Sequence, residues 1–399
     1  MPSCPFPDPN QPGLPPFFRV AVDMDEARSP MFAALRLAEK GRFSTAPNPC
    51  VGAVLVRDGE VAAQGFHTRC GAPHAEVAAI ANARELGVDL SQSELYVTLE
   101  PCNHHGKTPP CTEAILKAGI QRVCIGALDP NPDVAGGGAQ RLRDAGVEVR
   151  VGELGEQCRD VIADFLTWKD KQRPFVLLKL AATLDGKIAA ASGHSKWISS
   201  EASRTLVHQL RSKVDAVLVG GNTLHHDDPQ LTPRLGGDAE GTQTPPLAVA
   251  VTSRLPEPGS SFLTRERPGE TIFFTGPDNA GSEAAKLLMK RGCRVPQLGK
   301  AGNEVDLKLG LEYLYEHCGC RYVLCEGGGL LAGSLLDAGL ADHILLFLAP
   351  KIAGDVSARP MVAGRGLADM SGALDLRIID SRMLGPDLLV SAKPGQDLE

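Results

Sequence analysis

The stretch His74-Ala75-Glu76, followed by Cys102 and then Cys111, decides how this chain of 399 residues is interpreted. One imidazole and two thiolates suit a catalytic zinc ion, which takes about three protein ligands and keeps one position open for water. A carboxylate two residues after the histidine is well placed to take a proton from that water. We therefore predict that His74, Cys102 and Cys111 bind one Zn²⁺ and that Glu76 is the general acid/base.

The spacing of the two cysteines leaves alternatives open. The general signature of zinc nucleobase deaminases is H-x-E followed by P-C-x-x-C, whereas eight residues, 103–110, separate the cysteines here. A purely structural zinc site is one alternative; it would want four protein ligands, and Cys70 or His104 could be the fourth. Unrelated buried residues are another, because an isolated H-x-E or a lone cysteine is common in proteins.

The flanking sequence predicts that these residues lie at the ends of helices and strands. Pro73 precedes the apolar run 75–80, which indicates a helix with proline in its first turn. Residues 95–99 indicate a buried strand that ends just before Cys102, and residues 111–116 indicate the next helix. We expect the start of that helix to favour thiolate over thiol at Cys111.

Two further segments, TAPNPCVG at 45–52 and CNHHGKTPPC at 102–111, make a resemblance specific. With them the chain resembles the bifunctional riboflavin-biosynthesis deaminase/reductase family. The resemblance implies a first domain similar to cytidine deaminases, acting on a free diaminopyrimidinone that carries a phosphoribosylamino group. It also implies that Asn48, His104 and Lys107 contact the substrate; an amide suits a pyrimidinone edge, and the other two suit a ribose phosphate. A turn residue before Pro49 is the alternative for Asn48.

Composition and charge agree with an enzyme acting on free metabolites. The length suggests two or three domains, and 43% hydrophobic with 22% charged residues is ordinary for a globular enzyme. The formal net charge of −7 argues against a nucleic-acid partner. Eleven cysteines without a secretory signal indicate reduced thiols in the cytoplasm. The late apolar stretch 344–350 is too short to span a membrane.

The order of predicted elements indicates an α/β protein of two domains. In the first part strands and helices alternate, which is typical of a layered α/β domain. A charged helix is predicted from 156 to 171, and Gln172-Arg173-Pro174 should end it. We therefore predict a disordered tail at 1–26, a zinc deaminase domain at 27–172 and a second domain at 173–399.

A second α/β pattern starts at Pro174, and no zinc motif recurs in it. Its predicted strands are 175–180, 216–219, 247–251, 271–274, 322–325 and 343–348, and its predicted helices lie near 200–212, 283–291, 305–317 and 329–338.

Two strand-to-glycine junctions in this half could bind phosphate. Glu326-Gly327-Gly328-Gly329 follows one predicted strand, and Gly220-Gly221 follows another. Backbone N–H groups at a helix start suit a pyrophosphate, and glycine allows close approach. The pattern does not match G-x-G-x-x-G, and a tight turn would also explain each junction. Together they suggest a dinucleotide site without a Rossmann motif.

The resemblance to the same family extends from Pro174 to about Lys393, through LDGK at 184–187, SGHSKWI at 192–198, DDPQLT at 227–232 and the glycine junction at Glu326. It implies a reductase domain similar to dihydrofolate reductase in fold, with NADPH as cofactor. A helix cap or turn is the alternative for the pair Asp227 and Asp228. The implied substrate contacts are Ser195, Arg211, Leu231, Arg234 and Glu326, and the implied NADPH contacts are Ala181, Trp197, Thr223, Asp227, Ser253, Gly328, Gly329, Leu330, Leu331, Ala332, Gly333 and Ser334.

The implied reactions are hydrolytic loss of the 2-amino group from the pyrimidinone and then reduction of the ribosyl group to ribityl. A deaminase of nucleosides or RNA would share the zinc motif but would leave the second half unexplained. A zinc-stabilised binding protein with a degenerate reductase domain is the other alternative. Assembly into a homo-oligomer is expected only from its general frequency.

Overall fold

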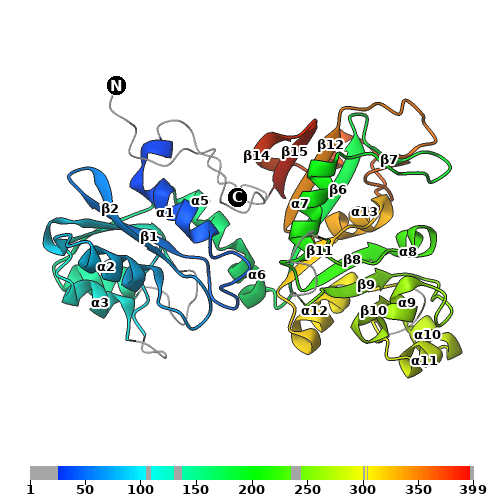
Figure 1. The fold of residues 1–399 in the computed structure, drawn as a ribbon, viewed down its shortest axis with the longest axis horizontal. Helices are drawn as coiled ribbons and strands as arrows, with labels where there is room; N and C mark the ends of the chain where they lie inside the picture. Colours follow the sequence, from blue (N-terminus) through cyan, green and yellow to red (C-terminus); the bar gives the residue numbers. More distant parts are fainter. Residues whose placement is uncertain are drawn as a thin grey trace. The chain divides into compact units, whose positions relative to one another are not determined.

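The protein forms two compact units, Met1–Lys169 and Asp170–Glu399 (Figure 1). The structure is a computed structural model, and it describes residues 26–104, 109–129, 137–234, 244–299, 302 and 304–395. The predicted tail lies outside these residues, except for Glu26, which begins the 3-10 helix η1 (Glu26–Arg28). The two units are described separately.

The first unit is built on a five-stranded mixed sheet with the strand order β2-β1-β3-β4-β5. Strand β1 is antiparallel to both β2 and β3, whereas β3, β4 and β5 run parallel. Alternate residues of β1 enter two different cores: Ala53 and Leu55 one, Val54 and Val56 the other. The strands are β1 (Gly52–Arg57), β2 (Glu60–Phe66), β3 (Glu94–Leu99), β4 (Arg122–Ala127) and β5 (Glu148–Val151).

Helices cover both faces of this sheet, so the predicted layered α/β domain is confirmed, and it has three layers in the order α/β/α. Helices α1 and α5 pack into one core, and α2, α3 and α4 pack into the other (Figure 1). The helices are α1 (Pro30–Glu39), α2 (Ala75–Glu85), η2 (Leu90–Gln92), α3 (Cys111–Lys117), α4 (Gly138–Asp144), α5 (Gly155–Val161) and α6 (Ala163–Asp170).

The single helix predicted for 156–171 is wrong, because the chain forms α5 and α6 with a break between them. The backbone leaves helical geometry at Ile162 (φ −102°, ψ 11°), and the Ile162 side chain is fully buried. Apolar periodicity across the segment does not reveal such a break, since buried residues lie on both sides of it.

A buried ion network joins the two ends of the first unit. The Arg42 guanidinium donates two hydrogen bonds to Glu39, at 2.6 and 2.7 Å, and one to Asp164, at 2.9 Å. Arg42 also donates to the carbonyl of Val161. All three charged side chains are buried, and neighbouring carboxylates compensate a buried cation. The loop after α1 is thereby tied to α6.

The second unit is built on an eight-stranded mixed sheet with the order β10-β9-β8-β11-β6-β12-β15-β14. The first six strands are parallel, and β15 and β14 add an antiparallel edge. The strands of this unit are β6 (Phe175–Thr183), β7 (Lys187–Ala189), β8 (Ala216–Gly220), β9 (Leu247–Val251), β10 (Thr271–Phe274), β11 (Tyr322–Cys325), β12 (His343–Ala349), β13 (Arg359–Pro360), β14 (Leu376–Leu384) and β15 (Asp387–Pro394); β7 and β13 form a separate pair.

The helices of the second unit include all four that were predicted. Helices α12 and α13 pack against one face of the sheet in a hydrophobic core. The helices are α7 (Glu201–Arg211), α8 (Gly221–Asp227), α9 (Phe262–Glu266), η4 (Pro268–Glu270), α10 (Pro277–Ala280), α11 (Glu283–Lys290), α12 (Leu307–Cys318), α13 (Gly329–Asp337) and η5 (Met370–Gly372).

The sequence did not reveal the hairpin β14–β15. Leu376, Ile378 and Met383 of β14 are exposed, and the strand has an irregular register between Ile378 and Asp380. A bulge shifts the alternation of polar and apolar residues, so the two-residue period of a strand is lost.

Among the helices that the structure describes, none combines the length and the apolar character that crossing a bilayer demands.

Candidate active sites

Three predicted ligands converge in the first unit. His74 is the N-cap residue of α2, with extended backbone geometry. Cys111 is the first residue of α3, and Cys102 lies in the loop after β3. Two helix starts and one strand end therefore bring together side chains that are up to 37 residues apart in the chain.

The geometry of these three residues fits a zinc ion. Nδ1 of His74 lies 3.3 Å from Sγ of Cys111 and 3.6 Å from Sγ of Cys102. Two ligands of a tetrahedral zinc with bonds of about 2.0–2.3 Å are about 3.5 Å apart. All three ligand atoms lie within 4.8 Å of one another, and within the described ranges the group contains neither Cys70 nor His104. Three protein ligands are typical of a catalytic site, and four of a structural one.

The pKa values of the Cys102 and Cys111 thiols are shifted in opposite directions. Hydrogen bonds from the Cys111 side chain, from His74 and from the Cys111 backbone lower the pKa of Cys102 to about 4. The hydrogen bond with Cys102 and burial raise the pKa of Cys111. The first N–H of α3 donates to Cys102 Sγ, at 3.4 Å, so this helix start stabilises a thiolate at Cys102. A thiolate at Cys111 in the metal-bound site stays a prediction.

Glu76 lies in the first turn of α2 and is only 3% exposed. Burial raises the pKa of this carboxyl to about 6. Burial disfavours the charged form, so Glu76 can hold a proton at a pH where an exposed glutamate would not. A group of this kind suits proton transfer near neutral pH.

Asn48 has a partner that the sequence did not indicate. Its Nδ2 lies 3.1 Å from Nε2 of His67, a buried residue just after β2. Burial lowers the pKa of His67, which favours the neutral ring. Of the other predicted substrate contacts in this unit, His104 is exposed, and Lys107 lies outside the described residues.

The second site lies where parallel strands of the other unit end. Strands β8, β11 and β6 are neighbours, so their carboxyl ends share one edge of the sheet. Glu326 directly follows β11 and accepts two hydrogen bonds from Arg211, at 2.6 and 3.0 Å. Although burial opposes it, the Arg211 charge lowers the pKa of Glu326. Arg211, at the end of α7, also donates to the carbonyl of Thr232.

Lys179 is a further charged residue at this edge. It lies on β6, and the register pairs the preceding residue, Leu178, with Cys325, directly before Glu326. Burial lowers the pKa of Lys179, against the opposing effect of the Glu326 charge. A lysine within the apolar sequence of β6 was the available signal, because an ammonium partly removed from water needs a compensating charge.

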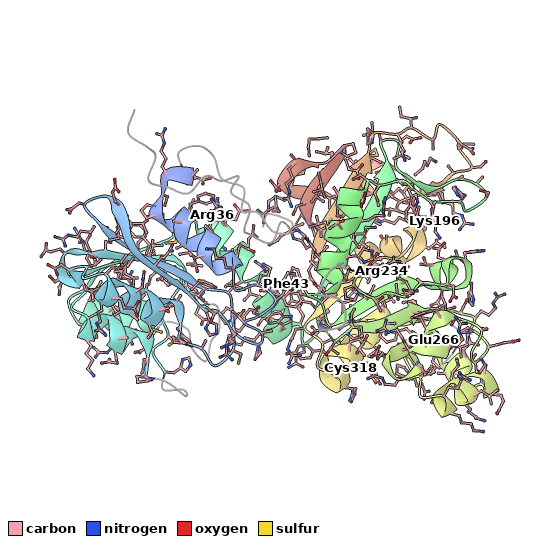
Figure 2. The ribbon with its side chains drawn as sticks, in the orientation of Figure 1. Arg36, Phe43, Lys196, Arg234, Glu266 and Cys318 are labelled. Carbon is pink, nitrogen blue, oxygen red and sulfur yellow. The ribbon has the colours of Figure 1, made fainter. Side chains whose placement is uncertain are left out.

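The remaining predicted substrate contacts lie in loops of the second unit. Ser195 is half-buried, Leu231 is buried and Arg234 is exposed. Figure 2 labels Arg234 and also Lys196, the neighbour of Ser195 and Trp197, among the side chains of this unit.

The predicted cofactor contacts are spread over several strand ends. Ala181 lies on β6, and Thr223 and Asp227 lie on α8, directly after β8. Ser253 follows β9 and is exposed. The Trp197 ring is 63% exposed and lies below the Arg204 guanidinium, 4.5 Å from its centroid.

Asp228, beside Asp227, has a structural role of its own. It adopts left-handed geometry at the end of α8, and its carboxylate accepts a hydrogen bond from the backbone of Phe262. The turn interpretation therefore holds for Asp228, while the side chain of Asp227 is exposed.

The glycines at the start of α13 differ in what surrounds them. A Cβ on Gly329 would lie 2.4 Å from the carbonyl of Pro360, and one on Gly333 would lie 2.1 Å from the carbonyl of Ala363. A Cβ on Gly328, the N-cap residue, would meet nothing closer than 4.0 Å. Gly329 and Gly333 therefore allow another chain segment to approach, and Gly328 is the glycine with open space.

The rest of the α13 segment contributes mainly to packing. Leu331 and Ala332 are buried in the core, so a ligand could meet only their backbone. Leu330 and Ser334 are exposed, and the Ser334 hydroxyl donates to the Leu330 carbonyl.

The segment 350–363, which we name the strap, packs against both α13 and the turn between β6 and β7. Asp185 accepts hydrogen bonds from the backbone of Ala353 and Gly354, at 3.0 and 2.8 Å. A hydrogen bond from the Thr183 hydroxyl, together with these two backbone bonds, lowers the pKa of Asp185. At its other end, the strap donates from Ala363 to the carbonyl of Gly329. The segment LDGK at 184–187, which contains Asp185, contributed to the family resemblance, but no role was predicted for Asp185 itself.

Both halves of the chain match known protein families. Residues 24–127 match the cytidine and deoxycytidylate deaminase zinc-binding region, and residues 174–390 match the RibD C-terminal domain. The second match accounts for the half that a lone nucleoside or RNA deaminase would leave unexplained.

Relatives and solved structures cover nearly the whole chain. The riboflavin biosynthesis protein RibD of Aquifex aeolicus is 40% identical over 91% of this chain and 97% of its own length. The protein of that name from Escherichia coli is 37% identical, over 90% and 96%. A Thermotoga maritima structure, described as a diaminohydroxyphosphoribosylaminopyrimidine deaminase/5-amino-6-(5-phosphoribosylamino)uracil reductase, has a TM-score of 0.73 at 38% identity and covers 93% of this chain and 99% of its own. Acinetobacter baumannii RibD has a TM-score of 0.71 at 34% identity, over 94% and 100%. The chain therefore belongs to the RibD family of bifunctional riboflavin-biosynthesis deaminases and reductases.

Proposed function

We propose that the first unit removes the 2-amino group of 2,5-diamino-6-(5-phosphoribosylamino)pyrimidin-4-one, and that the second unit reduces the ribosyl group of the product to ribityl. The observation that carries this proposal is the convergence of His74, Cys102 and Cys111 beside buried Glu76, in a chain whose other half matches a reductase domain.

His74, Cys102 and Cys111 would hold the zinc ion, which would supply the Lewis acidity that makes water nucleophilic at neutral pH. The Glu76 carboxylate takes one proton from the attacking water. Glu76 then returns this proton to the departing amine, and the second hydrogen of the water passes to the ring nitrogen beside carbon 2, so that ammonia leaves and a carbonyl remains at carbon 2. The raised pKa of Glu76 suits both steps, because the proton must be accepted and then released.

NADPH would supply a hydride to carbon 1 of the opened ribosyl group. Gly328 supports such binding: it has open space, and it is the N-cap residue of α13, in the short loop after the parallel strand β11, without a side-chain cap. Arg211, Arg234 and Ser195 would hold the ribose phosphate and its hydroxyl groups. The reduction also needs one proton, and the Lys179 ammonium, next to Glu326, is a group able to donate it.

The finer features of this function are also proposals. We infer that residues 27–172 and 173–399 are the two catalytic domains, with a free small-molecule substrate rather than a nucleic acid or a membrane. All cysteines that the structure describes are unpaired, which supports a reducing compartment such as the cytoplasm. A homo-oligomer is compatible with the general frequency of symmetric assembly.

Mass spectrometry of the pyrimidinone substrate tests the proposal. Zinc-loaded protein should replace the amino group by oxygen without NADPH, and should add two hydrogens to the product when NADPH is present. Deamination without reduction would contradict the role of the second unit. An unchanged substrate would contradict both roles.

A further inference from the structure

We propose that His67 fixes the orientation of the Asn48 amide, so that Asn48 presents its oxygen, and not its NH₂ group, to the substrate ring. This role in positioning Asn48 rests on the proposed deaminase function of the first unit. In this proposal His67 does not touch the substrate itself; it determines which atom of the Asn48 amide faces the substrate.

The observation is a chain of two hydrogen bonds through one imidazole. Nδ1 of His67 lies 3.0 Å from the carbonyl oxygen of Pro73, and Nε2 lies 3.1 Å from Nδ2 of Asn48. His67 is 3% exposed, and its ring makes an edge contact with the His74 ring, with centroids 5.4 Å apart. His67 therefore joins Asn48 to the residue directly before a proposed zinc ligand.

The protonation of the ring follows from its partners. A peptide carbonyl can only accept, so Nδ1 of His67 must carry a hydrogen to bond Pro73. Nδ2 of Asn48, 3.1 Å from Nε2, can only donate, so Nε2 accepts and carries no hydrogen. Only the NH₂ group of an amide can donate to it, because two acceptors facing each other form no hydrogen bond. The Asn48 amide is thus held with NH₂ toward His67 and with its oxygen directed elsewhere.

The backbone on both sides of this pair is also held. The His67 N–H donates to the carbonyl of Val51, and the Asn48 N–H donates to that of Thr45. A Cβ on Gly41 would lie only 2.5 Å from the His67 carbonyl, so this strand end packs closely against the loop that carries Asn48. With both backbones fixed, rotation of the amide is the remaining freedom, and His67 removes it.

The consequence is selectivity for a ring edge that donates a hydrogen bond. An amide oxygen accepts from the N–H or amino group of an aminopyrimidinone, whereas an amide NH₂ group would favour a ring with acceptors there. An unfixed amide could present either atom, and a site whose polar group mismatches its substrate discriminates poorly.

Nitrogen NMR of the histidine-labelled full-length protein tests the geometry without any substrate. We expect the His67 ring, assigned by its loss in His67→Phe, to be a neutral tautomer with hydrogen on Nδ1 and none on Nε2. Hydrogen on Nε2, alone or on both nitrogens, would overturn the proposal. This reading does not depend on deaminase activity, so it stands apart from a failure of the proposed function.

A double-mutant cycle tests the consequence. His67→Phe and Asn48→Ala should each raise the KM of deamination roughly tenfold or more, with zinc content retained and reduction unaffected. The double variant should be no worse than Asn48→Ala alone, because His67 acts only through Asn48. Additive losses, or a KM for His67→Phe equal to that of the wild type, would contradict the proposal. His343→Phe, at a buried histidine of the other unit, is the matched control and should leave the KM of deamination unchanged.

Discussion

The two proposed sites of this molecule differ in how they would hold their ligands. The first uses side-chain atoms: one nitrogen and two sulfurs come within 4.8 Å of one another, beside a single buried carboxyl. The second would use strand ends, a helix start with open space at Gly328, and a partly buried pair of opposite charges, Arg211 and Glu326. A metal site therefore depends on a few specific atoms, whereas a dinucleotide site depends on how closely backbone segments pack. Substitutions should therefore affect the first site through the loss of single side-chain atoms and the second site mainly through changes in packing.

The largest effect is expected at Glu76. Glu76→Gln should lower kcat of deamination by about 10²–10⁴-fold or more, because the amide cannot carry the proton. Zinc content, measured by mass spectrometry of the metal, should stay at one per chain, since Glu76 is not a proposed ligand. The reductase rate on the deaminated substrate is the internal control. Retained deamination would remove Glu76 from the mechanism.

The next effect is expected at Glu326. Glu326→Gln leaves the partly buried Arg211 without its carboxylate, which should cost up to about 3–5 kcal/mol of folding free energy, and the reductase rate should fall with it. Because the folded pKa of Glu326 is lowered, its stabilisation is complete above the ordinary glutamate pKa and is lost as the pH falls through the folded value.

Thermal unfolding between pH 3 and 7 checks this prediction. The wild type should lose stability toward acid more steeply than Glu326→Gln, while deamination at neutral pH stays normal. Parallel pH profiles of the two proteins would show that the pair does not stabilise the second unit.

A smaller effect on stability should distinguish Gly333 from Gly328, the N-cap residue of the same helix. Gly333→Ala places a Cβ against the Ala363 carbonyl and should destabilise the second unit by about 1–3 kcal/mol, as overpacking does. Gly328→Ala is the matched control: it should leave stability nearly unchanged and raise the KM for NADPH. Denaturant unfolding and reductase kinetics measure the two quantities. Equal stability losses in both variants would refute the distinction between packing and binding glycines.

The smallest effect is expected at Asp185. Asp185→Asn weakens the hydrogen bonds to the backbone of Ala353 and Gly354, so the strap should be held less firmly beside α13. We expect a severalfold increase in the KM for NADPH, with kcat and deamination nearly unchanged. Asp355→Asn, on the same strap, serves as the control. An unchanged KM would show that the strap does not influence the cofactor site.

The sequence predicted those parts of the fold that depend on short-range patterns of apolar and helix-starting residues. The strands with unbroken apolar runs, such as 175–180, and the helix starts at His74 and Cys111 appear as expected. The break at Ile162 and the hairpin after Leu376 were missed, because burial on both sides of a helix and a bulge in a strand each conceal the underlying period.

The candidate sites show the same limit. The zinc ligands could be predicted, because a metal demands particular residue types at restricted spacings. The partnership of His67 with Asn48 could not, since it depends on a contact between a loop and a strand end. The second site was predicted mainly from the family resemblance. The need for glycine at 329 and 333 depends on the close approach of the strap, which the sequence does not indicate.

The network of Arg42, Glu39 and Asp164 determines where the first unit can be cut. The deaminase family match ends at residue 127, but a fragment ending there would lack α6 and with it Asp164. Arg42 would keep only part of its charge compensation, and breaking a buried ion pair typically costs about 3–5 kcal/mol. An independently folding deaminase fragment should therefore extend through Lys169, some forty residues past the end of the family match, and domain exchange between relatives should use a junction at or after that position.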